Sequence, residues 1–325
     1  MAYQVPSASA PHANIVAAIN GNHASVDSTG KSHWDSTEID PSGTELYISV
    51  PDATDFLTGV AVVNAAKSLY NTHRTYSNAG INTHIYAHLN SDTTNVVTTA
   101  DMDGTSLYNT MFQAIKTLYL EIRTAYVNHI NNKKPDQTTA AYHTGIDTVD
   151  VLGAVPTIND EADLAVDMNN CKAQYNLHIV NTTGVHGASD AGNAITAANA
   201  VQGNLDTFIT LVNQMKTKIN AHFATAGMVH TGAFGADNQN TIVGAAVSYP
   251  AGLFTLINEI YTDYEAHRAD ATLYHQVADA TNVLTGGYYP VTTLAGFVTA
   301  AQEQKTKINA HFRNAPAYSR AVRVV

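Results

Sequence analysis

The octapeptide Lys-Thr-Lys-Ile-Asn-Ala-His-Phe stands at residues 216–223 and again, unchanged, at residues 305–312. The start positions, 216 and 305, lie about 89 residues apart, which predicts two periods of roughly 44 residues. Internal repetition on this scale is typical of proteins in which small helical units stack on one another. The duplicated stretch therefore indicates a chain built from tandem copies of one module.

The histidines follow the same repetition in two series. The first series closes a run of apolar segments, and the second follows each of its first five members. The first series is His73, His129, His178, His222, His267 and His311. The second series is His88, His143, His186, His230 and His275. Behind each second histidine comes an acid with a polar residue three positions later: Asp92/Asn95, Asp147/Asp150, Asp190/Asn193, Asp237/Asn240 and Asp279/Asn282. The spacing is His-x-x-x-Asp except between His230 and Asp237, where six residues intervene.

The apolar segments have the spacing of helix faces. Leu253, Ile257, Ile260, Tyr264 and His267 follow one another at steps of 4, 3, 4 and 3 residues, which places all five on one face of a helix. The polar block behind each helix predicts an aspartate or asparagine cap on a short helical turn. Because one such unit cannot bury its apolar stripe alone, we predict a mostly α fold of tandem helical repeats of about 45 residues, forming an elongated bundle or an α-solenoid.

The repeat region has predicted bounds of 51–312 and holds about five units plus a final helix. Residues 1–50 are predicted to be an extended N-terminal arm with a short strand at 45–50, and residues 313–325 an extended C-terminal tail. The acidic stretch Asp101-Met102-Asp103-Gly104 lacks the spaced ligands of a calcium loop and is interpreted as the turn that starts a helix.

Composition excludes several classes of function. The formal net charge of −11 argues against binding to nucleic acids or anionic membranes. No apolar run approaches the roughly 20 residues of a membrane span, and the N-terminus lacks the features of a signal peptide. The single cysteine, Cys171, excludes an intrachain disulfide and is expected in the core. Charged residues make up only 13%, which favours a protein that works inside an assembly.

The recurrent histidines and aspartates suit two interpretations. Imidazole and carboxylate ligands favour Zn²⁺ or another divalent metal, with one site in each unit. The predicted metal triads are His73/His88/Asp92, His129/His143/Asp147, His178/His186/Asp190, His222/His230/Asp237 and His267/His275/Asp279. The other interpretation is a metal-free hydrogen-bonded network, in which the first histidine reaches a cap at the start of the next helix. The sequence favours the network, because three ligands per site and the displaced Asp237 count against metal.

An enzyme is the third and least favoured hypothesis. The motifs of hydrolases, P-loop proteins and zinc proteases are absent, and five near-copies of one catalytic centre would be unusual. We therefore predict no catalytic residues, no certain cofactor and no small-molecule substrate. Since eleven histidines adjoin the predicted core, the array is also expected to loosen near pH 6.5, where free imidazole titrates.

The repeated block resembles repeats in structural proteins of tailed-bacteriophage virions. The stretches that carry the resemblance are Leu-Tyr-Asn-Thr-His (69–73), Tyr-Glu-Ala-His-Arg (264–268) and His-Gln-Val-Ala-Asp-Ala-Thr-Asn (275–282), and it extends over about 52–312. It implies a non-enzymatic virion component, assembled in the host cytoplasm, whose partners are its own copies and other virion structural proteins. Capsid, neck, tail and fibre positions all stay open. The arms and the longer loops at 74–87 and 130–142 are expected to contact neighbouring subunits.

Overall fold

The protein is mostly helical, as the sequence predicted. The computed structural model describes residues 47–75, 91–133, 136, 138, 142–226, 230, 236–271 and 278–313. Within these ranges the α-helices are α2 (Phe56–His73), α3 (Gly104–Ile130), α4 (Glu161–His178), α5 (Leu205–Ala224), α6 (Thr255–Ala269) and α7 (Leu294–Arg313). Two short 3-10 helices, η1 (Ala191–Asn193) and η2 (Gly286–Tyr288), lie in the connections. The same ranges contain no strand, and an isolated bridge joins Val201 and Asn204.

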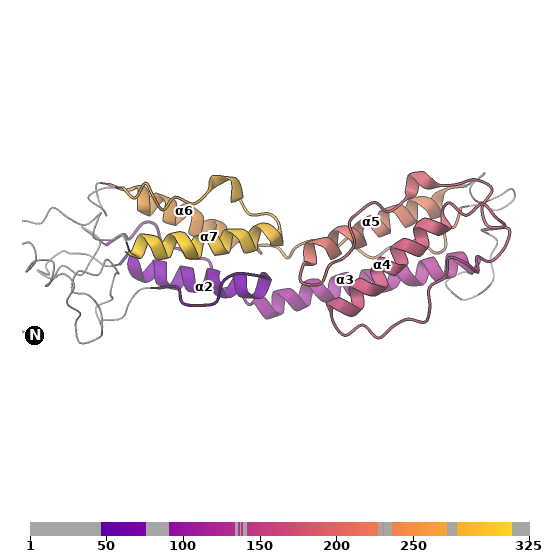
Figure 1. The fold of residues 1–325 in the computed structure, drawn as a ribbon, viewed down its shortest axis with the longest axis horizontal. Helices are drawn as coiled ribbons and strands as arrows, with labels where there is room; N and C mark the ends of the chain where they lie inside the picture. The colour runs from indigo at the N-terminus through magenta and orange to yellow at the C-terminus, as the bar shows by residue number, and fades with distance from the viewer. Residues whose placement is uncertain are drawn as a thin grey trace, which may run out of the picture.

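The helices form two three-helix bundles that lie end to end (Figure 1). One bundle packs α2, α6 and α7 against one another, and the other packs α3, α4 and α5. Contacts of α2 with α3 and of α5 with α7 join the two bundles. At the junction, a side chain on Gly104 would come within 3.1 Å of Val60, so the glycine lets the start of α3 lie close against α2. The result is an elongated molecule with two separate bundle ends.

The helices start near the middle of the molecule and end at its tips. Residues at or near the starts of five helices line one shared cavity: Asp55, Tyr108, Glu161, Leu205 and Leu294. Tyr108 donates a hydrogen bond of 2.8 Å to Glu161, and the Ala295 N–H donates one of 2.9 Å to Asp206 across the same junction. The three helices of a bundle therefore run parallel, and each connection has to return along the bundle before the next helix begins (Figure 1).

Local sequence explains where several helices begin. The Asp55 side chain caps α2 by accepting a hydrogen bond from the Thr58 N–H. The Thr58 hydroxyl accepts one from the Asp55 N–H, and the two bonds together make a capping box. Asp103 caps α3 by accepting from the Ser106 N–H, so the acidic stretch before Gly104 starts a helix as predicted. The buried faces also follow the predicted spacing: Phe208, Val212, Met215, Ile219 and His222 are all inaccessible to solvent. Cys171 is a buried free thiol, also as predicted.

Paired hydrogen bonds from asparagine side chains hold the returning segments against the helices. Asn220 on α5 is typical: its amide donates to the Ile242 carbonyl at 2.9 Å, and its oxygen accepts from the Ile242 N–H at 2.9 Å. The same pair of hydrogen bonds joins Asn64 to Met102, Asn71 to Val97, Asn169 to Ala200, Asn176 to Ile195, Asn213 to Val247 and Asn258 to Val291. Each such asparagine side chain pairs with the N–H and the carbonyl of one residue of the returning segment, as the backbone of a neighbouring strand would.

Most of the two predicted arms lies outside the described residues. Of the predicted strand at 45–50, residues 47–50 are described and they are not in a strand. Ile48 is instead buried against α7, where its N–H donates a 2.7 Å hydrogen bond to the Asn309 side chain. Residues 1–46 and 314–325 fall beyond the described ranges, as do residues 76–90, which include most of the predicted loop 74–87, and parts of the predicted loop 130–142.

Candidate metal centre

Three histidines meet at the tip of the α3–α4–α5 bundle. His129, His178 and His222 lie in the last turn of their helices and are fully buried. The ring centroids are 5.3 Å apart for His129 and His178, 5.1 Å for His129 and His222, and 5.4 Å for His178 and His222. Because the helices run parallel, equivalent positions on all three arrive at the same level. The three rings form a nearly equilateral triangle across the bundle axis.

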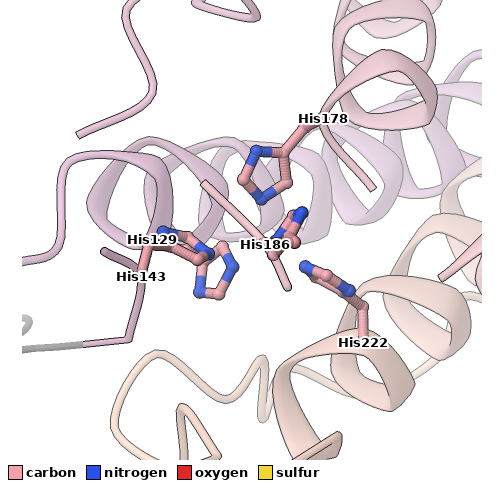
Figure 2. A group of neighbouring side chains, drawn as sticks. All are labelled: His129, His143, His178, His186 and His222. Carbon is pink, nitrogen blue, oxygen red and sulfur yellow. The ribbon is translucent and has the colours of Figure 1, made fainter. Parts of the chain in front are cut away.

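A second layer of three histidines comes from the connections that follow these helices. His143, His186 and His230 are buried beside the first triangle. Their ring centroids lie 4.8 Å apart for His143 and His186, 5.3 Å for His143 and His230, and 5.6 Å for His186 and His230. Figure 2 shows five of the six rings gathered around a common space. Those five can each place one ring nitrogen so that all lie within 4.8 Å of one another.

The aspartates lie outside the ring of imidazoles and bind the outer nitrogen of the helix histidines. The Nδ1–Oδ2 distance is 2.8 Å for His178 and Asp147, 2.8 Å for His222 and Asp190, and 2.9 Å for His129 and Asp237. With the aspartates ionised, each Nδ1 carries the proton and donates to the carboxylate. That hydrogen bond fixes the ring and aims Nε2 inward, as the outer partners of metal-bound histidines do.

A tight turn positions each aspartate. The Asp237 N–H donates to the Phe223 carbonyl, one residue past His222, at 2.7 Å. Its Oδ1 accepts from the N–H groups of Gln239 and Asn240, and its Oδ2 accepts from the Asn240 side chain at 2.8 Å. Asp92, Asp147 and Asp279 make the same backbone and Oδ1 bonds. The predicted short helical turn is therefore present only at η1, because elsewhere the carboxylate itself closes the turn.

A buried tyrosine three residues before the histidine anchors the same turn. Tyr126 donates to the Asp150 carbonyl at 2.6 Å, and Tyr175 donates to the Asn193 carbonyl at 3.1 Å. Tyr175 also reaches the Lys218 carbonyl of the neighbouring helix at 3.0 Å. The tyrosine column that the sequence placed in the core thus fixes the turn to its helix.

Burial keeps the six imidazoles neutral. It lowers the pKa of His178 to about 4, although the hydrogen bond that His178 donates to Asp147 acts in the opposite direction, and it lowers the pKa of His230 to about 4. Burial, with repulsion from neighbouring histidines, brings the pKa of His186 to about 3 and holds those of His129 and His143 well below the ordinary value. Burial also lowers the pKa of His222. Neutral imidazoles keep the lone pair that binds a metal ion.

Burial and hydrogen bonding shift the pKa values of the three aspartates around this centre in different directions. Burial opposes ionisation of Asp147, but hydrogen bonds from His178 and from backbone N–H groups outweigh it and hold the Asp147 pKa well below its ordinary value. The pKa of Asp190 is lowered for a similar reason, with His222 and Asn193 as donors. Burial dominates at Asp237 and raises its pKa.

The inner nitrogens of the centre have no hydrogen-bond partner. This holds for Nε2 of His129, His178, His222 and His230, and for both ring nitrogens of His143 and His186. His230 uses its Nδ1 on the Thr225 carbonyl. An unsatisfied buried polar group typically costs about 1–3 kcal/mol. Five of these imidazoles place a ring nitrogen within 4.8 Å of one another, and the ring of His230 lies beside them. This arrangement indicates a ligand that accepts several nitrogen lone pairs at once, which is the property of a metal cation.

A smaller cluster of the same kind lies in the α2–α6–α7 bundle. His73, His267 and His311 place ligand atoms within 4.8 Å of one another. The Nδ1–Oδ2 distance is 2.8 Å both for His267 and Asp92 and for His311 and Asp279. His88 and His275, predicted as ligands of this half of the chain, lie outside the described residues.

The grouping differs from the triads drawn within single units. The structure gathers His129, His143, His178, His186, His222 and His230 into one centre and pairs each aspartate with a histidine of another unit. His143 and Asp147 do not act as a pair, because the Asp147 carboxylate accepts a hydrogen bond from His178. The longer spacing before Asp237 does not displace its carboxylate from this scheme. The sequence-based site left out His311 and the clamping asparagines, although each of these asparagines stands two or nine residues before a first-series histidine.

Comparison with known proteins gives no relative for this arrangement. No family model, curated protein or solved structure matches the chain. Among the described helices, none combines the length and apolar character that crossing a membrane requires.

Proposed function

We propose that the protein is a structural, metal-binding protein in which a buried metal ion fastens the tip of the α3–α4–α5 bundle. One observation carries the proposal: six buried imidazoles have unpartnered nitrogens, and five of them place those nitrogens within 4.8 Å of one another, with His230 beside them. Both interpretations of the sequence contribute to it. The aspartates form a hydrogen-bonded network with the outer nitrogens, and the inner nitrogens serve the metal.

The site suits a structural ion better than a catalytic one. Catalytic metal sites keep a coordination position open for water or substrate, whereas structural sites are closed by protein ligands. Here the imidazoles come from three helices and the three connections that follow them, and all are inaccessible or nearly so. A bound ion would link segments as far apart as His129 and His230, and its binding free energy would add to the free energy of folding.

Metal analysis of the full-length chain tests this function. We expect inductively coupled plasma mass spectrometry of the purified protein to find at least one transition metal ion per chain. Removal of the ion by a strong chelator should lower the melting temperature, and its return should restore it. His178→Gln should bind the metal more weakly than the wild type, whereas Asn238→Ala, which alters an exposed side chain of a nearby connection, should bind it unchanged. Absence of metal, together with no uptake on refolding with divalent ions, would contradict the proposal.

A second proposed role concerns assembly. We propose that the chain works as a virion structural component that contacts copies of itself and other virion proteins. The elongated shape supports this role, and so do valines exposed along the returning segments, such as Val149 at 74% and Val243 at 81%. Negative-stain images of the purified chain and of its native source should show rings, fibres or a coat. A monodisperse monomer at high concentration without particle association would contradict this role.

The tandem-repeat origin of the chain is part of the same proposal. Its support is the recurrence of one set of contacts: an asparagine clamp, a tyrosine on the turn, and an aspartate on the histidine of another helix. Copies of one module along the chain would then have packed around two axes, one for each three-helix bundle.

A further inference from the structure

We infer that the centre in the α3–α4–α5 bundle is a six-coordinate, all-nitrogen site for a divalent ion of the group Fe²⁺, Co²⁺ and Ni²⁺. All six imidazoles are its ligands, and three aspartates form its outer shell. The inference rests on the metal-binding function proposed above and adds to it the coordination number and the class of ion.

The two triangles of histidines are staggered. The ring of His143 lies 4.4 Å from His129 and 5.1 Å from His178. The ring of His186 lies 4.6 Å from His178 and 5.1 Å from His222, and that of His230 lies 4.9 Å from His222 and 5.2 Å from His129. Each ring of the loop layer therefore sits over one edge of the helix triangle. Two triangles staggered in this way are opposite faces of an octahedron.

The remaining pairs are those expected to be opposite each other. Among the described residues, ring contacts join every pair of the six histidines except His129/His186, His143/His222 and His178/His230. With metal–nitrogen bonds of about 2.1 Å, neighbouring ring centres in an octahedral hexa-imidazole site lie about 4.7 Å apart, and opposite centres about 6.6 Å. The contacts between neighbours here range from 4.4 to 5.6 Å. Five of the six residues already place a nitrogen within 4.8 Å of one another, so a small contraction that brings in His230 would complete the site.

Coordination number decides among the metals. Zn²⁺ in structural sites is almost always tetrahedral, and no four corners of an octahedron form a tetrahedron. Zinc would therefore leave two buried imidazoles unsatisfied, at about 1–3 kcal/mol each. Mg²⁺ and Ca²⁺ require oxygen ligands, and Cu²⁺ prefers a tetragonal site. Fe²⁺, Co²⁺ and Ni²⁺ accept both imidazole nitrogen and six-fold coordination.

Charge also favours a cation at the centre. The ligands are neutral, but Asp147, Asp190 and Asp237 bind the outer nitrogens of three of them within 2.9 Å. A divalent ion offsets the negative charge of this shell through the intervening imidazoles, whereas an anion would be repelled by it. The carboxylates also raise the basicity of the ligands to which they are bound.

Cobalt is the most direct probe of the inference. The full chain is stripped with a chelator, refolded with CoCl₂ alone and examined by visible absorption. A six-coordinate site gives only weak bands, and X-ray absorption of the Ni²⁺-loaded chain should show six nitrogen neighbours at about 2.1 Å. Intense tetrahedral cobalt bands, or a shell of four nitrogens, would overturn the inference and leave the metal-binding function standing. No uptake of any divalent ion would overturn both.

Variants of His186, one of the three histidines in the connections, distinguish a site with six ligands from one with fewer. His186→Ala should lose at least about tenfold in Co²⁺ affinity, because even outer-shell partners commonly contribute about 10–100-fold. Its nickel shell should fall to five nitrogens, and His186→Gln serves in its place if the alanine variant does not fold. Thr182→Ala, an exposed change in the same connection, should keep the wild-type affinity and spectrum. Unchanged affinity in a folded His186 variant would show that His186 is not a ligand.

Discussion

The Nδ1 atom of His129 lies 2.9 Å from the Oδ2 atom of Asp237, although 108 residues separate the two in the chain. The other two pairs of this bundle join a helix to the connection just before it, as His178 does with Asp147. The His129–Asp237 pair instead joins the first helix to the last connection. It thereby closes a ring of three histidine–aspartate pairs around the bundle tip.

Asp237→Asn is expected to weaken metal binding by about 10–100-fold without unfolding the chain. The amide keeps the shape of the carboxylate but loses its charge, so it holds the His129 ring less firmly. Competition with a chelating dye measures the affinity. Asp101→Asn, which alters the exposed partner of Lys67, is the control and should bind metal as the wild type does. Equal affinities for Asp237→Asn and wild type would remove Asp237 from the outer shell.

Tyr126→Phe is expected to lower the free energy of unfolding by about 1–3 kcal/mol. The change deletes the 2.6 Å hydrogen bond to the Asp150 carbonyl and leaves that acceptor buried without its donor. Urea denaturation followed by circular dichroism gives the value. Tyr288→Phe, at an exposed tyrosine, should change stability by less than about 0.5 kcal/mol. A similar small effect at Tyr126 would mean that the anchor contributes little.

Asn220→Ala is expected to cost about 1–3 kcal/mol, because it removes both hydrogen bonds to the Ile242 backbone. The segment around Ile242 should then exchange its amide hydrogens faster, which hydrogen exchange with mass spectrometry measures. Asn238→Ala changes an exposed asparagine four residues before Ile242 and is the matched control. Unaltered exchange at 242 in the Asn220 variant would argue against the clamp.

The metal-free protein is expected to lose stability as the pH falls from about 6.5 toward 4. Burial lowers the pKa of His178 and His230 to about 4 and that of His186 to about 3, so the unfolded chain binds these protons first. Each such histidine then lowers the free energy of unfolding by about 1.4 kcal/mol per pH unit. Urea denaturation in chelator at stepped pH measures this slope. A free energy of unfolding that stays constant from pH 7 to 4.5 would contradict it.

The sequence alone predicted the helices and the histidines of the site better than it predicted which residues pair with one another. The spacing of apolar residues predicted the helices, and Asp103 marked the start of α3. The two histidine series also marked the residues that meet at the bundle tip. These features are local, and each depends on a few neighbouring residues.

The partners depend on features that are not local. Pairing His143 with Asp147 assumed a helical turn, but the Asp147 side chain binds the N–H groups of Val149 and Asp150 and closes a different turn. The ring closure between His129 and Asp237 requires three parallel helices, a direction that only the long returning connections make feasible. The clamping asparagines have a regular spacing in the sequence, but each one lies on a helix and its partner is the backbone of a returning segment, whose path no local pattern specifies.

The opposed directions of the two bundles have a mechanical consequence. Helices ordinarily fray at their ends, where backbone carbonyls lack partners. Among the described helices, those that reach the two tips do so with their carboxyl-terminal ends, and histidine–aspartate pairs tie these ends together. Opening a bundle from its tip would therefore first have to break these pairs, so they oppose fraying at both ends of the molecule.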